Sequence, residues 1–284
     1  MTTIPDIVKV LTDAGIEQNE ANIEVKLLIE HFCGYSLIDI LTGKKLTSKM
    51  LEIVEEKAKL RAKTKQPIQY IIGLADFMGE KFIVNSSVLI PRDETELLVR
   101  QAIELIKENN FTEIMDMCTG SGCIACMIAK LTNAHVVGVD ISTEAIHTAF
   151  SNMEKFELFN KAVFRKSDLY SKIREDEEFD MIVSNPPYIP PQMKANIQKE
   201  VSFEPDLALY TLDSKGLDFY ERITKDANLH LKKDGYLLFE LGIGQSREVA
   251  EIMQKYNFSE IKVLKDLAGI DRVIFGKLSG KIGS

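Results

Sequence analysis

The tetrapeptide Asn185-Pro186-Pro187-Tyr188 combines features that could hold a planar –NH2 group. Consecutive prolines cannot continue a helix or donate to a strand ladder, so the chain must leave the preceding strand as a stiff, extended segment with free carbonyl groups. The side-chain oxygen of Asn185 and the carbonyl of Pro186 could each accept one N–H hydrogen, while Tyr188 offers an aromatic face for stacking. We therefore predict that Asn185, Pro186, Pro187 and Tyr188 bind a substrate amide or amino group.

The same pair of acceptors would activate the nitrogen that it holds. An amide nitrogen is a poor nucleophile because its lone pair is delocalised into the carbonyl group. Accepting both hydrogens would raise the electron density on nitrogen and aim the lone pair at an electrophile such as a methyl sulfonium. No general base is needed for the attack, because the proton can leave after transfer. We predict that Asn185, Pro186 and Tyr188 are catalytic in a methyl transfer.

A second cluster of candidate residues follows the strands that precede this segment. The loop Cys118-Thr119-Gly120-Ser121-Gly122 joins an apolar run to a helix, and its glycines allow a sharp turn and a close approach to a ligand. Asp140 ends the next predicted strand, where a carboxylate can accept hydrogen bonds from both hydroxyls of an adenosine ribose. Asp168 and Leu169 follow the third strand, within reach of an adenine amine. The predicted cofactor-binding residues are Cys118, Thr119, Gly120, Ser121, Gly122, Asp140, Asp168, Leu169 and Asn185.

These cofactor residues leave alternatives open. Gly120, Gly122 and Ala125 also match the dinucleotide fingerprint G-x-G-x-x-A, so NAD fits as well as S-adenosylmethionine, and a plain tight turn fits too. Asp140 could cap the following helix, although Ser142 can do this instead. Asp168 could belong to a surface turn. The Asn-Pro-Pro-Tyr segment favours S-adenosyl-L-methionine, because it suits methyl transfer to nitrogen.

Hydrophobic periodicity predicts the elements that carry these residues. Residues 5–65 show helical spacing, including a helix that Thr47 and Ser48 would cap and that ends near Lys63, which predicts a small helical bundle. Short β-rich runs at 68–73, 81–84 and 88–91 predict a hairpin linker, and residues 94–107 return to helical spacing. We thus expect an N-terminal helical domain at 1–65, a β-hairpin linker at 66–92 and a catalytic domain at 93–284.

Strands and helices alternate beyond residue 112. The alternation predicts an α/β fold with a doubly wound, mainly parallel, Rossmann-like sheet. In such a sheet the ligand lies outside the carboxyl ends of the strands, at the point where the strand order reverses. The predicted strands are Ile114–Met117, Val136–Val139, Ala162–Phe164, Met181–Val183, Tyr236–Phe239, Ile261–Leu264 and Val273–Phe275.

Composition narrows the class of protein. The 284 residues carry a net charge of −8, which disfavours sequence-blind binding to phosphate backbones, and the basic stretch between residues 44 and 65 is interpreted as a solvated helix face. No apolar run is long enough to span a membrane, and the first residues lack the pattern of a secretory signal, so we expect a cytoplasmic protein with reduced cysteines. Cys123 and Cys126 are expected to be small core residues. The scattered histidines predict no metal site.

The sequence resembles the bacterial release-factor glutamine methyltransferases over nearly its whole length. These enzymes modify the glutamine of the Gly-Gly-Gln tripeptide in class 1 peptide chain release factors. Two positions depart from the family pattern: Cys118 replaces a glycine and Asp93 replaces a second proline. The matching stretches are Pro67–Gly73, Leu89–Glu96, Thr119–Gly122, Ile182–Ile189, Glu200–Val201, Glu204–Pro205, Gly216–Asp218 and Ala268–Val273.

The resemblance implies a seven-stranded class I methyltransferase domain with a final antiparallel strand, and an N-terminal domain that grips the release factor. It implies that the loop 118–122, Asp140, the Asp168-Leu169 neighbourhood and Asn185 contact S-adenosylmethionine. It also implies that residues 185–188 bind the glutamine and that Arg92, Thr95 and Glu96 lie close to the cofactor. Methylation of the glutamine N5 nitrogen in a translation-termination factor is therefore the expected activity, with no membrane partner and no direct nucleic-acid substrate.

Two other functions remain as alternatives. An N6-adenine DNA or RNA methyltransferase would use the same Asn-Pro-Pro-aromatic segment around a flipped base, but the acidic charge argues against it. A non-catalytic adaptor could bind S-adenosylmethionine and a partner, although such a protein would not need an intact Asn185-Pro186-Pro187-Tyr188 segment.

Overall fold

The computed structural model describes residues 2–36, 38–39, 42–196 and 200–280. The chain forms two compact units. One unit combines Met1–Gly73 with Gln198–Phe203, and the other combines Leu74–Ile197 with Glu204–Ser284. The first unit therefore continues past residue 65 and takes in a short segment from the far half of the sequence.

The first unit is built from helices, as the periodicity predicted. Its elements are α1 (Ile4–Asp13), α2 (Gln18–Cys33), α4 (Ser48–Thr64), α5 (Ile68–Ile72) and the short 3-10 helix η2 (Val201–Phe203). The predicted cap of α4 is confirmed, because the Thr47 hydroxyl accepts a hydrogen bond from the Met50 amide. Apolar side chains from α1, α2 and α4 form a core of their own in this unit.

A buried ion pair crosses the helical unit. The Arg61 side chain on α4 is only 1% exposed, and its Nε donates to both carboxylate oxygens of Glu24 on α2, at 3.0 and 3.2 Å. Its Nη2 also lies 3.3 Å from an oxygen of Glu200, in the segment that returns from the far half of the sequence. A guanidinium ion this deeply buried needs a carboxylate partner, so the pair ties α2 to α4.

Two predicted strands are wrong. Residues 68–72 form the helix α5, which Pro67 precedes and Gly73 ends with a left-handed φ of 78°. A short apolar run has no decisive period, so strand and helix could not be separated from the sequence alone. Residues 88–91 also lie outside any strand. The hairpin instead joins β1 (Leu74–Phe77) to β2 (Glu80–Ile83), so the predicted run at 81–84 marks its second strand.

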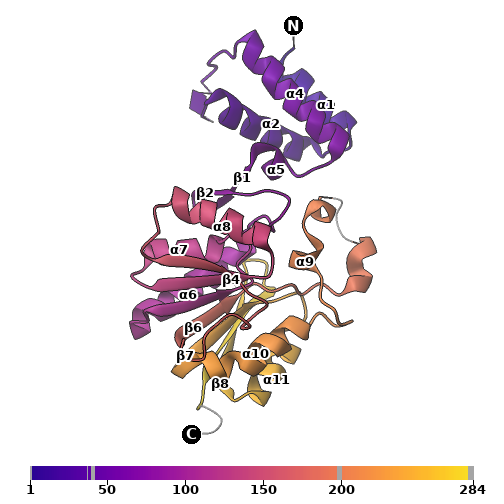
Figure 1. Ribbon diagram of the computed structural model, residues 1–284. Helices are drawn as coiled ribbons and strands as arrows, with labels where there is room; N and C mark the ends of the chain where they lie inside the picture. The colour runs from indigo at the N-terminus through magenta and orange to yellow at the C-terminus, as the bar shows by residue number, and fades with distance from the viewer. Residues whose placement is uncertain (1, 37, 40–41, 197–199, 281–284) are drawn as a thin grey trace. The chain divides into compact units, whose positions relative to one another are not determined.

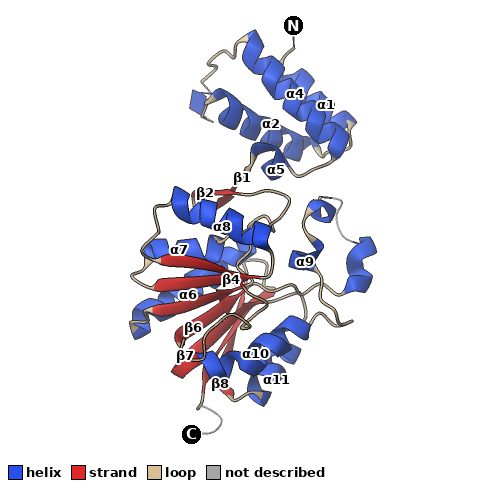
Figure 2. Cartoon of the chain, in the orientation of Figure 1, coloured by secondary structure: helices blue, strands red, loops and turns tan. Residues whose placement is uncertain are grey.

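The second unit is a seven-stranded sheet covered by helices on both faces (Figures 1 and 2). Its strands are β3 (Glu113–Met117), β4 (His135–Asp140), β5 (Ala162–Lys166), β6 (Phe179–Ser184), β7 (Leu231–Glu240), β8 (Phe258–Lys265) and β9 (Asp271–Leu278). Its helices are α6 (Asp93–Asn109), α7 (Cys123–Leu131), α8 (Thr143–Lys155), α9 (Asp206–Leu209), α10 (Asp218–His230) and α11 (Ser246–Lys255), with the 3-10 helix η1 (Pro191–Asn196). None of the described helices is both long and apolar enough to cross a membrane.

The strand order is β5-β4-β3-β6-β7-β9-β8. The strands from β5 to β7 pair in parallel, and β9 is antiparallel to both of its neighbours. All the strands predicted beyond residue 112 are confirmed, and so is the α/β, mainly parallel, Rossmann-like sheet with seven strands. The strand order reverses between β3 and β6. The switch point therefore lies where the glycine loop at 118–122 and the segment 185–188 begin.

Alternate residues of the central strands enter opposite hydrophobic cores. Ile114 and Met181 pack with α6, α7 and α8 on one face, whereas Met115 and Ile182 pack with α10 and α11 on the other. Burial on both faces explains why these strands are continuous apolar runs in the sequence. At the switch point, the Ser184 hydroxyl donates to the Met117 carbonyl at 2.6 Å and fixes the ends of β6 and β3 together.

We predict that Glu24→Ala lowers the free energy of unfolding by about 3–5 kcal/mol, because it leaves the Arg61 charge buried with only the more exposed Glu20 and Glu200 nearby. Urea unfolding of the full chain, followed by circular dichroism, measures the change. Glu56→Ala is the matched control, since its ion pair with Lys57 is on the surface and should be worth less than about 1 kcal/mol. Equal losses in the two variants would contradict a special role for the buried pair.

Candidate active site

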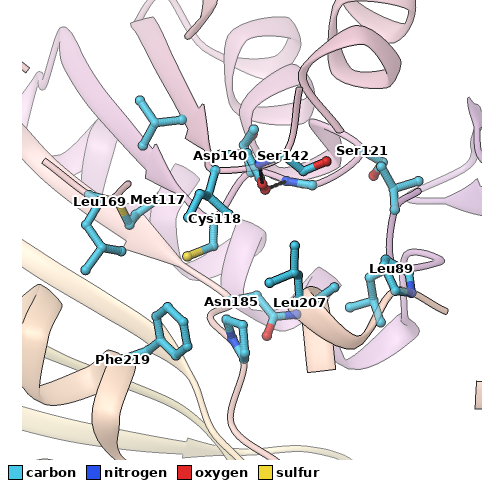
Figure 3. A pocket seen from close by; sticks show the side chains of 18 of the residues that line it. Leu89, Met117, Cys118, Ser121, Asp140, Ser142, Leu169, Asn185, Leu207 and Phe219 are labelled. Atoms are coloured by element: carbon cyan, nitrogen blue, oxygen red, sulfur yellow. Dashed lines mark hydrogen bonds between the residues drawn. The ribbon is translucent and has the colours of Figure 1, made fainter. Parts of the chain in front are cut away.

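A cavity of about 580 Å³ opens at the carboxyl edge of the sheet, in the second unit. This volume lies within the range of small-molecule sites. In Figure 3, Met117, Cys118 and Asp140 lie on one side of the cavity and Asn185 and Leu207 on the other. The loops after β3, β4, β5 and β6 all contribute to its lining, so the structure brings the sequence-predicted residues of these loops together.

The loop after β3 turns through three left-handed residues. Cys118, Gly120 and Gly122 have φ angles of 62°, 53° and 76°. A Cβ atom on Gly122 would come within 2.9 Å of Ala149 Cβ and of the Phe164 ring, so only glycine fits between α8 and β5. Cys118 adopts a conformation that glycine takes without penalty, which gives a physical reason for the glycine usual at this position.

Asp116 anchors the glycine loop from beneath. The carboxyl group is fully buried, and its Oδ2 accepts hydrogen bonds from the Thr119 hydroxyl at 2.5 Å and from the Ala125 amide at 3.1 Å. Burial raises the pKa of Asp116 to about 7. Sequence analysis missed this residue, although a carboxylate inside the buried run 114–117 could have revealed it, because a charged group is buried only when it has partners.

Asp140 occupies the end of β4 and lines the cavity. Its Oδ2 accepts from the Gly120 amide at 3.0 Å and its Oδ1 from the Ser142 amide at 2.9 Å. Burial raises the pKa of this carboxyl group, and the two amide hydrogen bonds oppose that effect. Each carboxylate oxygen can accept further hydrogen bonds. The Ser142 hydroxyl caps α8 by accepting from the Ala145 amide, so Asp140 is not needed as the helix cap.

Ser167, Asp168 and Leu169 follow β5 and also line the cavity. The Asp168 carboxylate lies 3.1 Å from Nη2 of Arg222 on α10, and both side chains are partly exposed. The Ser167 hydroxyl donates to the Leu169 carbonyl at 2.6 Å. This bond holds the turn in which Leu169 adopts a φ of 47°.

Asn185 presents one end of its amide to the protein and leaves the other without a partner. Its Nδ2 donates to the Thr95 hydroxyl at 3.3 Å. Within the described part of the chain, its Oδ1 accepts no hydrogen bond, and neither does the Pro186 carbonyl, which lies just outside the sheet. Asn185 and Pro187 line the cavity. Two oxygen acceptors without protein partners thus stand close together at the end of β6.

We call Asn185 and the Pro186 carbonyl the substrate rim. Tyr188 and the Pro186 ring do not belong to the lining of the cavity. The Tyr188 hydroxyl is 3.5 Å from Oε1 of Glu240 at the end of β7. The Tyr188 carbonyl accepts from Nε2 of Gln245 at 3.2 Å. Tyr188 is therefore fixed at both its ring and its backbone, and the proposed stacking of a substrate on its ring remains a prediction.

Glu240 and Gln245 support the site, and sequence analysis missed both. Glu240 is 3% exposed and accepts from the Thr95 hydroxyl at 2.6 Å. Gln245 connects Tyr188 to the carbonyls of Lys215 and Gly216 at 3.2 Å each. Glu240 could have been found from the sequence, because it is a carboxylate at the end of the apolar run 236–240, as Asp140 is at the end of its own strand.

Asp93 takes the first position of α6, after the extended residue Arg92. Proline is favoured at this position because the helix does not use that amide, and a carboxylate is favoured because it faces the positive end of the helix dipole. Either residue therefore suits the start of α6. Arg92 forms an ion pair with the buried Glu204, and Thr95, one turn further along, lines the cavity.

Cys123 and Cys126 pack in the core on the α7 face of the sheet, as expected for small core residues. Burial raises the pKa of both thiols, that of Cys123 to about 12. Both cysteines are free, and no cluster of metal-ligating side chains occurs among the residues that the structure describes.

The family model described as methyltransferase small domain matches residues 93–202. Solved structures share the fold. The catalytic domain of hMettl16 in complex with the MAT2A 3'UTR hairpin 6 has a TM-score of 0.57 at 15% identity, over 80% of this chain and 84% of that one. The Thermus thermophilus 16S rRNA N2 G1207 methyltransferase has a TM-score of 0.52 at 18% identity, over 72% and 49%. The fold is that of the class I methyltransferases.

The curated relatives define the family. A release factor glutamine methyltransferase of Flavobacterium psychrophilum is 38% identical over 87% of this chain and 88% of its own length. That of Geobacter sulfurreducens is 36% identical over 94% and 93%. That of Fusobacterium nucleatum is 42% identical over 79% of this chain, and the match spans 63% of the relative. The chain belongs to the release factor glutamine methyltransferase family.

The residues of the cavity fit S-adenosylmethionine, the cofactor of this class. Asp140 offers a carboxylate at a strand end for ribose hydroxyls, and the left-handed loop at 118–122 keeps its backbone open to the cavity. Leu169 and Phe219 supply apolar surface for a purine ring. We expect these groups and Asn185 to contact the cofactor, which supplies an activated methyl group when bound.

We predict that Asp140→Ala weakens binding of S-adenosylmethionine by about 10- to 100-fold, because it removes charged acceptors and the anchor of the Gly120 amide. Isothermal titration calorimetry gives the dissociation constant. Glu144→Ala is the control, since this exposed carboxylate on α8 does not line the cavity and should bind the cofactor like the wild type. An unchanged dissociation constant for Asp140→Ala would exclude the ribose contact.

Proposed function

We propose that this protein methylates the side-chain amide nitrogen (N5) of the glutamine in the Gly-Gly-Gln motif of class 1 peptide chain release factors, using S-adenosylmethionine. The observation that carries the proposal is the pair of unpartnered acceptors, Asn185 Oδ1 and the Pro186 carbonyl, beside the glycine loop and Asp140. The names of the family's curated relatives support the same substrate.

The rim at Asn185 suits an amide because its two free oxygens are acceptors, and an amide –NH2 group supplies donors. A glutamine –NH2 group has two donors, so it can satisfy both oxygens at once. A hydroxyl or thiol substrate would leave one acceptor without a partner, which costs binding energy in a partly buried site. Selectivity for an –NH2 group therefore follows from the number of free oxygens.

These contacts also prepare the nitrogen for attack. The two acceptors polarise the N–H bonds and raise the electron density on nitrogen, which strengthens the nucleophile, and the lone pair is directed out of the plane that Asn185 and Pro186 define. Because the prolines at 186 and 187 are stiff, the acceptors stay in place without a loss of entropy on binding. The proton leaves after the N–C bond forms, so attack requires no basic side chain.

We propose that the helical unit recognises the release factor outside the glutamine tripeptide. A tripeptide with two glycines offers few side-chain contacts, so an intact protein substrate must be recognised elsewhere. The helical unit has its own core and carries the basic stretch of residues 44–65, which includes α4. This assignment follows the domain organisation expected from the sequence: binding at residues 1–65, a linker at 66–92 and catalysis at 93–284.

We predict that Asn185→Ala lowers the rate of methyl transfer by about 10²- to 10³-fold, as the loss of a preorganised polar contact does elsewhere, while cofactor affinity changes far less. Radiolabelled cofactor is incubated with purified release factor, and the tryptic peptide with the Gly-Gly-Gln motif is examined by mass spectrometry. Asn133→Ala, an exposed asparagine between α7 and β4, is the control.

The same assay decides between the proposal and its rivals. Transfer to an adenine-containing oligonucleotide, with none to release factor, would favour the N6-adenine activity. Cofactor binding without turnover on either substrate would favour the adaptor. Near-normal turnover by Asn185→Ala would remove this residue from catalysis.

We further predict that release factor slows hydrogen–deuterium exchange in α2 and α4 of the full-length protein. Contact with a protein partner excludes solvent and stabilises the backbone that it covers. S-adenosylhomocysteine alone should protect the loops at 118–122 and 140–142 and leave α2 and α4 unchanged. Unaltered exchange throughout the helical unit, with release factor bound, would contradict its role in recognition.

A further inference from the structure

A buried hydroxyl and a buried carboxyl group lie directly behind Asn185. Thr95 on α6 is 2% exposed and Glu240 at the end of β7 is 3% exposed. The Thr95 hydroxyl donates to Glu240 Oε2 at 2.6 Å, and Asn185 Nδ2 donates to the same hydroxyl oxygen at 3.3 Å. The Asn185 side chain also lowers the pKa of Glu240. Glu240 does not line the cavity, so it acts only through its neighbours.

The direction of these hydrogen bonds fixes the orientation of the Asn185 amide. A hydroxyl group has one hydrogen, and Thr95 donates it to Glu240. The Thr95 oxygen can then only accept, and among the two ends of the Asn185 amide only Nδ2 can donate. Since the amide is planar, holding Nδ2 towards Thr95 turns Oδ1 away from it. Without this restraint the amide could flip and offer a donor where an acceptor is needed.

We propose that Thr95 and Glu240 are positioning residues for methyl transfer. The Glu240 carboxylate sets the Thr95 hydroxyl as an acceptor towards Asn185, and this keeps Asn185 Oδ1 available for the substrate –NH2 group. The inference rests on the proposed function of Asn185. It assigns a task to a carboxylate that touches neither the cavity nor the substrate.

The surroundings of Glu240 give the arrangement a pH dependence. Burial raises the pKa of Glu240 to about 7. The titratable and charged groups around it are Glu94 of α6, Cys123 of α7, Tyr188 after β6, Tyr220 of α10 and Arg272 of β9. When Glu240 is protonated, its own O–H competes for the Thr95 oxygen, so the restraint weakens as the pH falls through 7. The rate of methyl transfer should fall with it.

Single-turnover methylation of purified release factor tests the proposal. Glu240→Met removes the acceptors at similar volume, and Thr95→Val removes the hydroxyl at similar shape. Each is expected to slow methyl transfer by about 10- to 100-fold, similar to the loss caused by removing residues that orient the ligands of a metal site. Steady-state assays give the Michaelis constant for release factor, which should stay within about threefold of the wild-type value. Contacts that bind the substrate equally in the ground state and the transition state are not affected. Thr95→Ser keeps the hydroxyl and should retain most of the rate.

The double variant Thr95→Val/Glu240→Met separates positioning from simple destabilisation. Residues that act as one unit are non-additive, so the double variant should be about as slow as the slower single variant. Glu240→Gln should reduce the loss of rate between pH 8 and pH 6, and Asp116, whose pKa is also about 7, accounts for the loss that remains. This measurement is still informative if Glu240→Met folds poorly. Wild-type rates for Glu240→Met, multiplicative losses in the double variant, or an unchanged pH profile in Glu240→Gln would overturn the proposal. Absence of methylation by the wild type would instead overturn the proposed function.

Discussion

Buried polar groups must find partners, and this requirement organises the carboxyl edge of the sheet. Asp116 holds Thr119 and Ala125, Asp140 holds Gly120 and Ser142, and Ser184 holds Met117. The two carboxylates accept from backbone amides and from the Thr119 hydroxyl, and the Ser184 hydroxyl donates to a backbone carbonyl. Asn185 Oδ1 and the Pro186 carbonyl have no hydrogen-bond partner among the described residues, and neither do the buried Asp116 Oδ1 and Asp218 Oδ2. Asn185 lines the cavity, so its oxygen is available to a substrate.

The same requirement connects elements that are distant in the sequence. Thr95 lies in the first turn of α6, Asn185 follows β6 and Glu240 ends β7, and a short chain of hydrogen bonds joins them. Gln245 extends this chain to Tyr188 and to the loop before α10. The substrate rim is thus held from behind by groups whose own orientation is settled by the core. Stiff prolines determine where the backbone goes, and the buried network determines which atom of the amide faces outward.

Much of the catalytic fold could be predicted from the sequence, because parallel strands buried on both faces leave long apolar runs. Ile114–Met117 and Met181–Val183 are such runs, and their ends located the glycine loop and Asn185. The short run at 68–72 was misjudged as a strand, since five apolar-rich residues show no clear period and their fate depends on tertiary packing. Ile68 is buried in the core of the helical unit, a fact that no local pattern reveals.

The candidate site was predictable where a residue both follows a strand and touches the cavity. Asp140, Leu169 and Asn185 meet both conditions. Asp116 lies inside β3 and Glu240 is the last residue of β7, and neither lines the cavity. A single sequence does not show which buried carboxylates have partners. The orientation of the Asn185 amide could not be predicted either, since it depends on a hydroxyl ninety residues earlier in the chain.

Cys118 combines a left-handed backbone with a thiol at the edge of the cofactor cavity. Desolvation and the nearby Asp140 raise the pKa of this thiol far above its ordinary value, so almost none of it is the nucleophilic thiolate at neutral pH. Electrophilic reagents should therefore alkylate Cys118 slowly in spite of its position. An inhibitor aimed at this site would therefore gain little from a cysteine-directed warhead.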